Sequence, residues 1–299
     1  MTRPTMEIAY RIAHELLKDR LKEKAPEMLA ALEEIQEADV LVVRGQYDRI
    51  EEVFHHSGTP FTPVRGSDLS RVHLRPDQIV FVNCPGVVPV TSLRSLAAFV
   101  EDGGFLFTTD WALRHVVEPA FPGYLEYNLR RTADEVVRVE IRRSDDPFLS
   151  SLLGPEDDPQ WWLEASSYPI RILNPEKVEV LVSSAEIKER YGEAPVFVAF
   201  EVGAGKVYHM ISHFYLQRSE IRTMRHKAPS SAYLAEKGIG PEMMEKYRTL
   251  GTDTLDTGTV ESAYTSQTIT SRILLDKIRQ KQQRARRDED DEDAAKPQG

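Results

Sequence analysis

Apolar residues near the start of the chain recur at the spacing of an α-helix. Between residues 5 and 37 they fall three or four positions apart, with charged residues between them: Ile8, Ile12, Leu16, Leu17, Leu21, Met28, Leu29, Leu32 and Ile35. This pattern predicts two amphipathic helices. Pro26 separates them, because proline lacks a backbone N–H and disfavours helix at the residue before it. The short β-branched run at residues 40–43 then predicts a strand buried on both faces.

The middle of the chain repeats this order of elements. Residues 78–83 and 105–109 are apolar, strand-like runs, and an amphipathic helix is expected between them at residues 91–102. Strand, turn, helix and strand in this order predict a parallel sheet with helices on both faces. Loops at the carboxyl ends of such strands carry any site. Here these loops are residues 44–48, 84–87 and 110–114.

From residue 136 onward the strand-like runs alternate between apolar and polar positions. Alternation is typical of edge strands or of antiparallel additions to a sheet. We expect four such strands, at residues 136–141, 178–182, 195–200 and 206–211. The glycines of Gly203-Ala-Gly205 are expected to form a hairpin turn between the last two. The predicted fold is therefore α/β, with a flavodoxin-like, mostly parallel sheet and helical extensions at both ends of the chain.

The character of the chain changes after residue 218. Residues 219–260 contain many turn-forming residues, and a helix is expected from about residue 260 to residue 284. A run of charged residues follows, which cannot bury apolar surface and is expected to be disordered. We therefore divide the chain into an N-terminal helical extension (1–38), an α/β domain (39–218), a C-terminal helical arm (219–286) and a charged tail (287–299).

Composition and charge exclude several classes of protein. The chain has 299 residues with a net charge of −10, whereas a nucleic-acid-binding domain is expected to be basic. Its single cysteine, Cys84, excludes a disulfide framework and a multi-cysteine metal site. The sequence has no apolar run long enough to cross a bilayer, and its first residues lack a signal-peptide pattern. We expect a cytoplasmic protein with neither nucleic acid nor membrane as a partner.

Three segments carry a resemblance to a known superfamily. They read VFVNCPG at residues 80–86, FVEDGGFLFTTDW at residues 99–111 and GAGKVYHMISH at residues 203–213. In this order they resemble the class I glutamine amidotransferase-like superfamily, and they match its trehalose-utilisation-like branch better than the true amidotransferases. The resemblance covers about residues 39–216 and implies the flavodoxin-like fold.

The resemblance also implies where catalytic residues would lie. Catalytic members place a nucleophilic cysteine at the sharp turn that matches residues 109–111, and this turn contains no cysteine. The histidine of the catalytic triad matches His213, but Tyr215 stands where the acid is usually found two residues later. Cys84 matches the loop on the oxyanion side. The resemblance therefore implies the fold without the glutaminase nucleophile, and a chain that is not a glutaminase.

Cys84 and Asp110 remain candidates for chemistry. Cys84 is either a nucleophile activated by His213 or a small hydrophobic residue buried at a tight turn. Asp110 either pairs with His213 as part of a general base or caps the helix that follows it. We favour the buried residue for Cys84 and the cap for Asp110, although Asp110 can fill both roles.

An aromatic and acidic cluster is a candidate ligand pocket. Trp161, Trp162, Glu164 and Tyr168 follow an acidic loop, and ligand pockets are commonly aromatic with a few polar groups. The alternative is a loop packed over the edge of the sheet, in which two adjacent tryptophans are difficult to bury together. The candidate ligand-binding residues of the whole chain are Asp110, Trp111, Trp162, Glu164 and His213.

The histidine pairs do not predict a metal site. His209 and His213 are four residues apart, but in a strand this separates them by about 13 Å. His55 and His56 are adjacent and point to opposite faces if the chain is extended. Neither pair has clustered carboxylates beside it. We predict no metal site and no cofactor.

The leading functional hypothesis is a non-catalytic amidotransferase-like protein that acts as a ligand-binding or assembly module. The alternative is a hydrolase that uses His213 with Asp110 or Cys84. A protein partner or a homo-oligomer is expected at the C-terminal helix, because its apolar stripe must be covered: Ile269, Ile273, Leu274 and Ile278. We favour docking of this stripe on another chain, and a small molecule is a second candidate partner.

Overall fold

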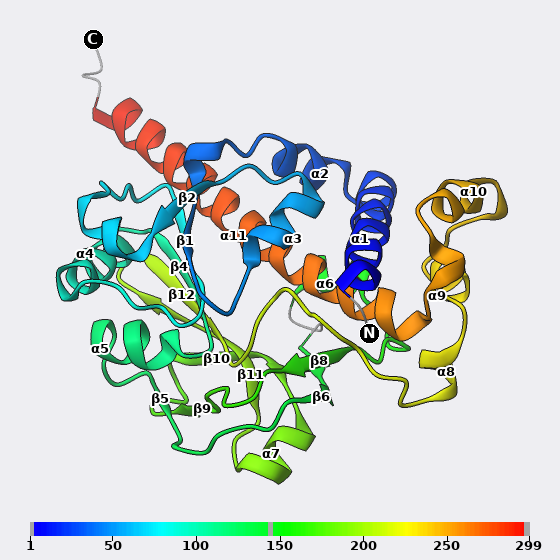
Figure 1. Ribbon diagram of the computed structural model, residues 1–299. Coiled ribbons are helices and arrows are strands. Elements are labelled where there is room, and N and C mark those ends of the chain that lie inside the picture. Colours follow the sequence, from blue (N-terminus) through cyan, green and yellow to red (C-terminus); the bar gives the residue numbers. More distant parts are fainter. Residues whose placement is uncertain (1–2, 143–145, 296–299) are drawn as a thin grey trace.

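An eight-stranded sheet forms the centre of the molecule in the computed structural model, which describes residues 3–142 and 146–295 (Figure 1). The first five strands in the sheet are parallel to one another, and the last three join in antiparallel pairs. In their order across the sheet the strands are β2 (Thr62–Arg65), β1 (Val40–Arg44), β3 (Ile79–Val82), β4 (Phe105–Thr109), β12 (Gly205–Met210), β11 (Pro195–Val202), β10 (Val178–Ser183) and β7 (Glu140–Ile141). The predicted α/β class and its mostly parallel sheet are confirmed.

The parallel strands are continuous apolar runs because both of their faces are covered. All residues of β3 and β4 are buried, and so are residues 40–43 of β1. Helix α3 (Ile50–Ser57) connects β1 to β2, and helix α4 (Val90–Glu101) connects β3 to β4. Two 3₁₀ turns, Glu37–Asp39 and Gly66–Arg71, complete this half of the fold.

Helices from the two ends of the chain lie together over one face of the sheet (Figure 1). They are α1 (Arg3–Lys24), α2 (Pro26–Glu33) and α11 (Thr257–Ala295). The buried Tyr10 hydroxyl connects these helices to the chain after β12. It donates to the carbonyl of Phe214 at 2.7 Å, accepts from the N–H of Leu216 at 3.0 Å, and lies 3.2 Å from the Ser266 hydroxyl of α11.

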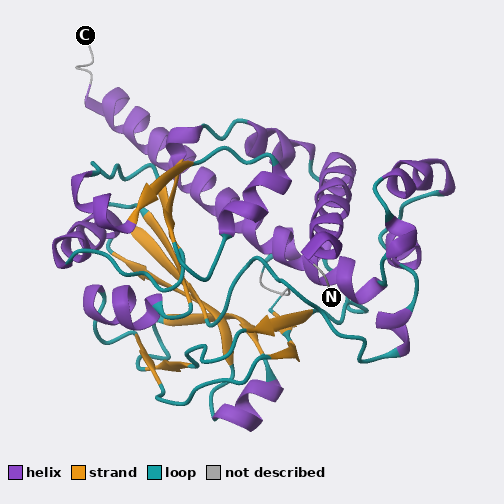
Figure 2. Cartoon of the chain, in the orientation of Figure 1, coloured by secondary structure: helices purple, strands orange, loops and turns teal. Residues whose placement is uncertain are grey.

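The apolar stripe of α11 is covered by its own chain, which corrects the interpretation that it docks on a partner. Ile269, Ile273 and Leu274 are each at most 3% exposed, and Ile278 is half-buried. α1 packs against α11, within the group of helices that Figure 2 shows in purple beside the sheet. Helical periodicity shows that such a stripe must be covered, but it does not indicate which surface covers it. The C-terminal arm therefore belongs to the helical layer of the fold.

The charged end of the chain also differs from the expected disorder. Helix α11 continues through the charged run as far as Ala295, and residues 296–299 lie outside the described part of the chain. The arginines, glutamates and alanines of this run have good helix propensity, although its aspartates do not, so a lack of apolar residues does not by itself end a helix.

Residues 136–141 do not form the single strand that alternation predicted. The chain leaves one sheet and enters another near Val139, whose N–H donates to the carbonyl of Pro159 at 3.1 Å. Before this point, β6 (Glu135–Arg138) pairs with β8 (Gln160–Leu163) in a separate two-stranded sheet. After it, β7 joins β10 at the edge of the main sheet.

The two adjacent tryptophans lie in strand β8 and not in a loop, and both are buried. The indole N–H of Trp161 donates to the carbonyl of His213 at 3.2 Å, and that of Trp162 donates to Asp134 at 2.7 Å. Adjacent residues of a strand point to opposite faces, and here each face is covered, so the objection to burying both does not hold.

The remaining elements surround this frame. Strands β5 (Leu125–Tyr127) and β9 (Ile170–Ile172) form a second small sheet. A π-helical turn at Leu113–Val117 and a 3₁₀ turn at Thr252–Thr254 accompany the short helices α5 (Glu118–Ala120), α6 (Pro147–Leu152), α7 (Ala185–Tyr191), α8 (Met224–Lys227), α9 (Ser230–Glu236) and α10 (Pro241–Thr249). Within the described ranges, the structure contains no helix that is both long and apolar enough to span a membrane.

Removal of one buried side chain from α11 tests this packing. We expect Ile273→Ala to lower the free energy of unfolding by about 2–5 kcal/mol, because it opens a cavity inside one chain. The oligomeric state, measured as the molar mass in solution, should not change. Urea unfolding and light scattering measure the two quantities. Gln283→Ala, on an exposed position of the same helix, is the control and should unfold like the unmodified protein. Unchanged stability of Ile273→Ala with an altered mass would instead support docking on a partner.

Candidate functional site

The parallel pairing of β4 with β12 determines where the candidate site lies. Thr109 pairs with Met210, and the N–H of Asp110 donates to the Met210 carbonyl at 2.8 Å. The chain therefore leaves both strands at the same edge of the sheet, with His213 three residues beyond β12. Cys84 follows β3, the neighbour of β4 on its other side, and reaches the same edge.

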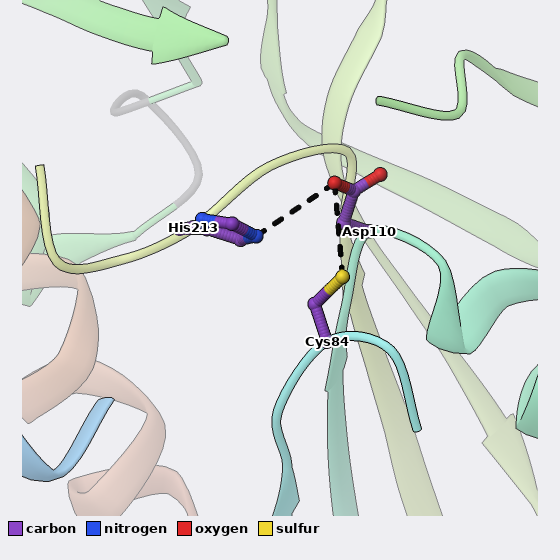
Figure 3. A group of neighbouring side chains, drawn as sticks. All are labelled: Cys84, Asp110 and His213. Atoms are coloured by element: carbon purple, nitrogen blue, oxygen red, sulfur yellow. Dashed lines mark hydrogen bonds and ion pairs between the residues drawn. The ribbon is translucent and has the colours of Figure 1, made fainter. Parts of the chain in front are cut away.

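Cys84, Asp110 and His213 form one buried cluster (Figure 3). Their residues are 1%, 3% and 1% exposed. An oxygen of Asp110, Oδ2, lies 3.7 Å from Nε2 of His213 and 3.9 Å from Sγ of Cys84. The structure thus brings together the three residues that sequence analysis named as candidates for chemistry, and Asp110 lies between the other two.

Asp110 does not cap the following helix, which corrects the favoured interpretation. Its Oδ1 accepts the N–H of Tyr168 at 2.9 Å, and its Oδ2 accepts the Ser167 hydroxyl at 3.1 Å. The N–H of Leu113 instead bonds to the backbone carbonyl of Asp110 at 2.9 Å. The carboxyl group faces the loop of residues 167–168 because that loop offers it two donors within the buried cluster.

The backbone of Asp110 turns sharply where β4 ends, with a positive φ like that found at nucleophile elbows. Its φ is +49°, a left-handed value that is uncommon for residues other than glycine. Nucleophile elbows use such a sharp strand-to-helix turn to present one side chain above the sheet. This turn presents a carboxyl group.

Burial favours the neutral form of each member of the cluster. It raises the pKa of Asp110 well above its ordinary value, and it raises the pKa of the Cys84 thiol, an effect that the neighbouring Asp110 increases. Burial also lowers the pKa of His213 to about 4, although the Glu164 carboxylate acts in the opposite direction. A thiol held in this way is a poor nucleophile, because the reactive species is the thiolate.

Glu164 supplies the carboxylate that the sequence after His213 lacks. Its Oε2 lies 3.3 Å from Nδ1 of His213, on the opposite side of the ring from Asp110. Sequence analysis included Glu164 among the ligand-binding candidates but did not pair it with the histidine. Glu164 directly follows β8, and β8 lies outside the three sequence segments that carry the family resemblance. Those segments therefore gave no indication that Glu164 lies beside His213.

A pocket of about 340 Å³ lies beside this cluster. It is lined by Met6, Gln46, Tyr47, Arg49, Glu164, Tyr215 and Gln217. Glu164 is therefore part of both the pocket and the buried cluster. The pocket loop is also tied to the cluster, because the N–H groups of Gln46 and Tyr47 donate to the Cys84 carbonyl at 3.0 and 3.2 Å. Gly45 permits this close approach, since a Cβ there would collide with that carbonyl oxygen.

Trp111 and Trp162, which were predicted to bind ligand, do not line the pocket and instead contact residues of the pocket and of the buried cluster. Trp111 stacks on Tyr168, meets the ring edge of Tyr47, and donates its indole N–H to the Ser166 carbonyl at 2.8 Å. Trp162 meets the ring of His213 edge-on, with the ring centres 6.0 Å apart. Both tryptophans therefore hold groups of the candidate site in position.

Asp48 is a buried acid at the same edge that sequence analysis left without a role. It is 1% exposed, its Oδ1 accepts the N–H of Arg49 at 2.7 Å, and burial raises its pKa to about 7. The sequence could have indicated Asp48, because it lies in the loop that follows the first buried parallel strand, and such loops carry site residues.

Comparison with known proteins finds only distant similarity to solved structures. The chain matches no protein-family model and no curated protein. Similar solved structures include a ThuA-like protein from Bacteroides uniformis (13% identity, 58% of this chain and 80% of that chain, TM-score 0.41) and a cytoplasmic protein from Salmonella typhimurium (12%, 59% and 88%, TM-score 0.41). They also include an exo-β-1,4-mannosidase from an Opitutaceae bacterium (12%, 71% and 34%, TM-score 0.39). The chain spans about a third of the length of that mannosidase.

The protonation of His213 provides a test of the site geometry. We expect its imidazole to stay neutral in the folded protein until the pH falls to about 4, whereas the unfolded chain takes up this proton near pH 6.5. Because the unfolded chain binds this proton first, the free energy of unfolding decreases as the pH falls from about 6.5 to about 4. NMR titration of the ring measures the folded-state pKa.

Glu164→Gln is the informative variant in this titration. Loss of its carboxylate should lower the pKa of His213 further. His209, which is buried on β12 with Nδ1 2.8 Å from the Thr108 hydroxyl, is the internal control and should not respond. A folded-state pKa of His213 near 6.5, unchanged in Glu164→Gln, would contradict the geometry described above.

Proposed function

We propose that this chain is a non-catalytic amidotransferase-like protein that binds a small polar molecule in the pocket beside Glu164. The observation that carries the proposal is the turn after β4, where a buried carboxyl group with left-handed backbone stands in place of a nucleophilic cysteine. The one cysteine of the chain lies on the neighbouring loop, with a thiol pKa raised by burial. An assembly role has less support, because α11 covers its apolar stripe within the chain.

The pocket lining supports a polar ligand. Arg49 and Glu164 provide groups of opposite charge, Gln46 and Gln217 provide amides, and Tyr47 provides an aromatic ring with a hydroxyl group. Few apolar side chains line the pocket, so recognition there depends on hydrogen bonds and charge. Amino acids and small carbohydrates both carry the matching groups.

The first prediction concerns the chemistry that this proposal excludes. The protein should release no ammonia from glutamine above the background rate, because no thiolate stands at the elbow. A coupled ammonia assay measures the rate, and Cys84→Ala should give the same background. Turnover by the unmodified protein that disappears in Cys84→Ala would contradict the proposal and assign a cysteine hydrolase.

The second prediction concerns binding. Among a panel of amino acids, monosaccharides and disaccharides, at least one compound should raise the unfolding temperature, since a ligand at 100 times its Kd adds about 2.7 kcal/mol. Arg49→Gln and Glu164→Gln should each reduce this shift, as measured by thermal unfolding and by calorimetric titration. Arg71→Gln, on a highly exposed arginine, is the matched control. The same shift in all variants, or no shift with any compound, would refute binding at this pocket.

The hydrolase alternative retains one specific supporting observation. The His213 ring lies between two carboxyl groups, with Asp110 near Nε2 and Glu164 near Nδ1. This is the order of a nucleophile, a base and an acid that orients the base. Hydrolysis of p-nitrophenyl acetate that is lost in both Asp110→Asn and His213→Gln, but kept in Cys84→Ala, would favour this second candidate.

A further inference from the structure

We infer that Cys84, Asp110 and His213 form a binding site for a thiophilic divalent cation of the zinc class, with a fourth position left for water or a ligand. The inference goes beyond the proposed binding of a polar molecule and does not depend on it. The expectation of no metal considered only histidine pairs close in sequence, whereas this cluster is assembled from the ends of three strands.

The distances within the cluster are close to those that a tetrahedral zinc ion requires. The Cys84 sulfur, an Asp110 oxygen and a His213 nitrogen all lie within 4.8 Å of one another, and two of the separations are 3.7 and 3.9 Å. Zinc bonds of about 2.0–2.3 Å in tetrahedral geometry place donor atoms about 3.3–3.6 Å apart. Side-chain movements of well under 1 Å in the measured pairs therefore bring these atoms to ligand distance.

His213 gives an independent indication of a missing partner. Its side chain is almost fully buried, and neither ring nitrogen has a hydrogen-bond partner. A buried polar nitrogen without a partner is costly, so native structures rarely leave one. Figure 3 shows the Nε2 edge of the ring directed toward Asp110, with the Cys84 sulfur approaching from the neighbouring loop. A cation between these three groups would supply the partner that Nε2 lacks.

The surroundings of the cluster also match those of a metal site. Ligand histidines commonly direct their other nitrogen to a carboxylate, which fixes the ring, and Glu164 stands 3.3 Å from Nδ1 of His213. The N–H of Tyr168 holds Oδ1 of Asp110, and Oδ2, which accepts the Ser167 hydroxyl, also faces His213 and Cys84. The Asp110 carboxyl is therefore held by hydrogen bonds before any ion arrives, and the His213 ring lies within ion-pair distance of Glu164.

The donor set selects the class of metal. A thiolate, an imidazole and a carboxylate suit zinc and its close relatives, whereas magnesium and calcium require oxygen ligands. Three protein ligands leave the fourth tetrahedral position free, the arrangement of zinc sites that bind an exchangeable molecule. Glu164, which lines the neighbouring pocket, contacts the far side of the His213 ring and would act on the ion only through that imidazole.

Cobalt(II) provides the test, because it replaces zinc and reports its ligands by colour. Protein stripped of metal by a chelator is titrated with Co²⁺ and then with Zn²⁺. We expect one Co²⁺ per chain, intense tetrahedral visible bands, a thiolate-to-cobalt charge-transfer band, and displacement of Co²⁺ by Zn²⁺. Since Cys84 is the only cysteine of the chain, that charge-transfer band identifies its ligand without any variant.

Variants then identify the other ligands. Cys84→Ser should abolish the charge-transfer band, and Asp110→Asn and His213→Gln should abolish the tetrahedral spectrum. Glu164→Gln should keep the spectrum and weaken binding about 10–100-fold. His55→Gln, on an exposed histidine, should change nothing. Circular dichroism tests whether each variant is folded. If a variant is not folded, the cobalt spectrum of the unmodified protein still shows whether Cys84 is a ligand.

The inference is overturned if Co²⁺ does not bind, or binds without the charge-transfer band. It is equally overturned if the band persists in folded Asp110→Asn and His213→Gln variants. Failure here is distinct from failure of the proposed function. A polar compound that still stabilises the metal-free protein through Arg49 and Glu164 would leave the pocket proposal intact.

Discussion

The parallel pairing of β4 with β12 is the interaction on which the candidate site depends. It joins two strands separated by about a third of the chain, and its register sets Thr109 beside Met210. Because both strands run in the same direction, Asp110 and the residues that lead to His213 leave the sheet at one edge. A shift of this register by one residue would reverse the face of each side chain of one strand and separate the two groups.

The helical layer also supports the chain segment that carries His213. α11 and α1 cover the sheet, and the Tyr10 hydroxyl holds the backbone of Phe214 and Leu216 directly after His213. The resulting burial, more than any charged neighbour, sets the chemistry of the cluster, because it favours a carboxylic acid, a thiol and a neutral imidazole.

The features that sequence analysis predicted are those that a local pattern determines. Continuous apolar runs identified β1, β3 and β4. The position of Asp110 and His213 after buried strands indicated a common edge. The cap for Asp110, the docking of the apolar stripe of α11 on another chain and the loop for Trp162 were wrong, because each depends on which distant segment supplies the contact. The pairing of Glu164 with His213 was missed for the same reason, since strand β8 alone places that carboxylate.

The central claim is that Cys84 is a buried, protonated thiol beside the elbow and not a nucleophile. The pH dependence of its alkylation by iodoacetamide in the metal-free protein tests this claim most directly, because the chain has no other cysteine. We predict slow alkylation at neutral pH that becomes fast only when denaturant unfolds the chain. Fast alkylation of the folded protein with a midpoint below pH 7, lost in Glu164→Gln or His213→Gln, would reveal an activated thiolate and contradict the account.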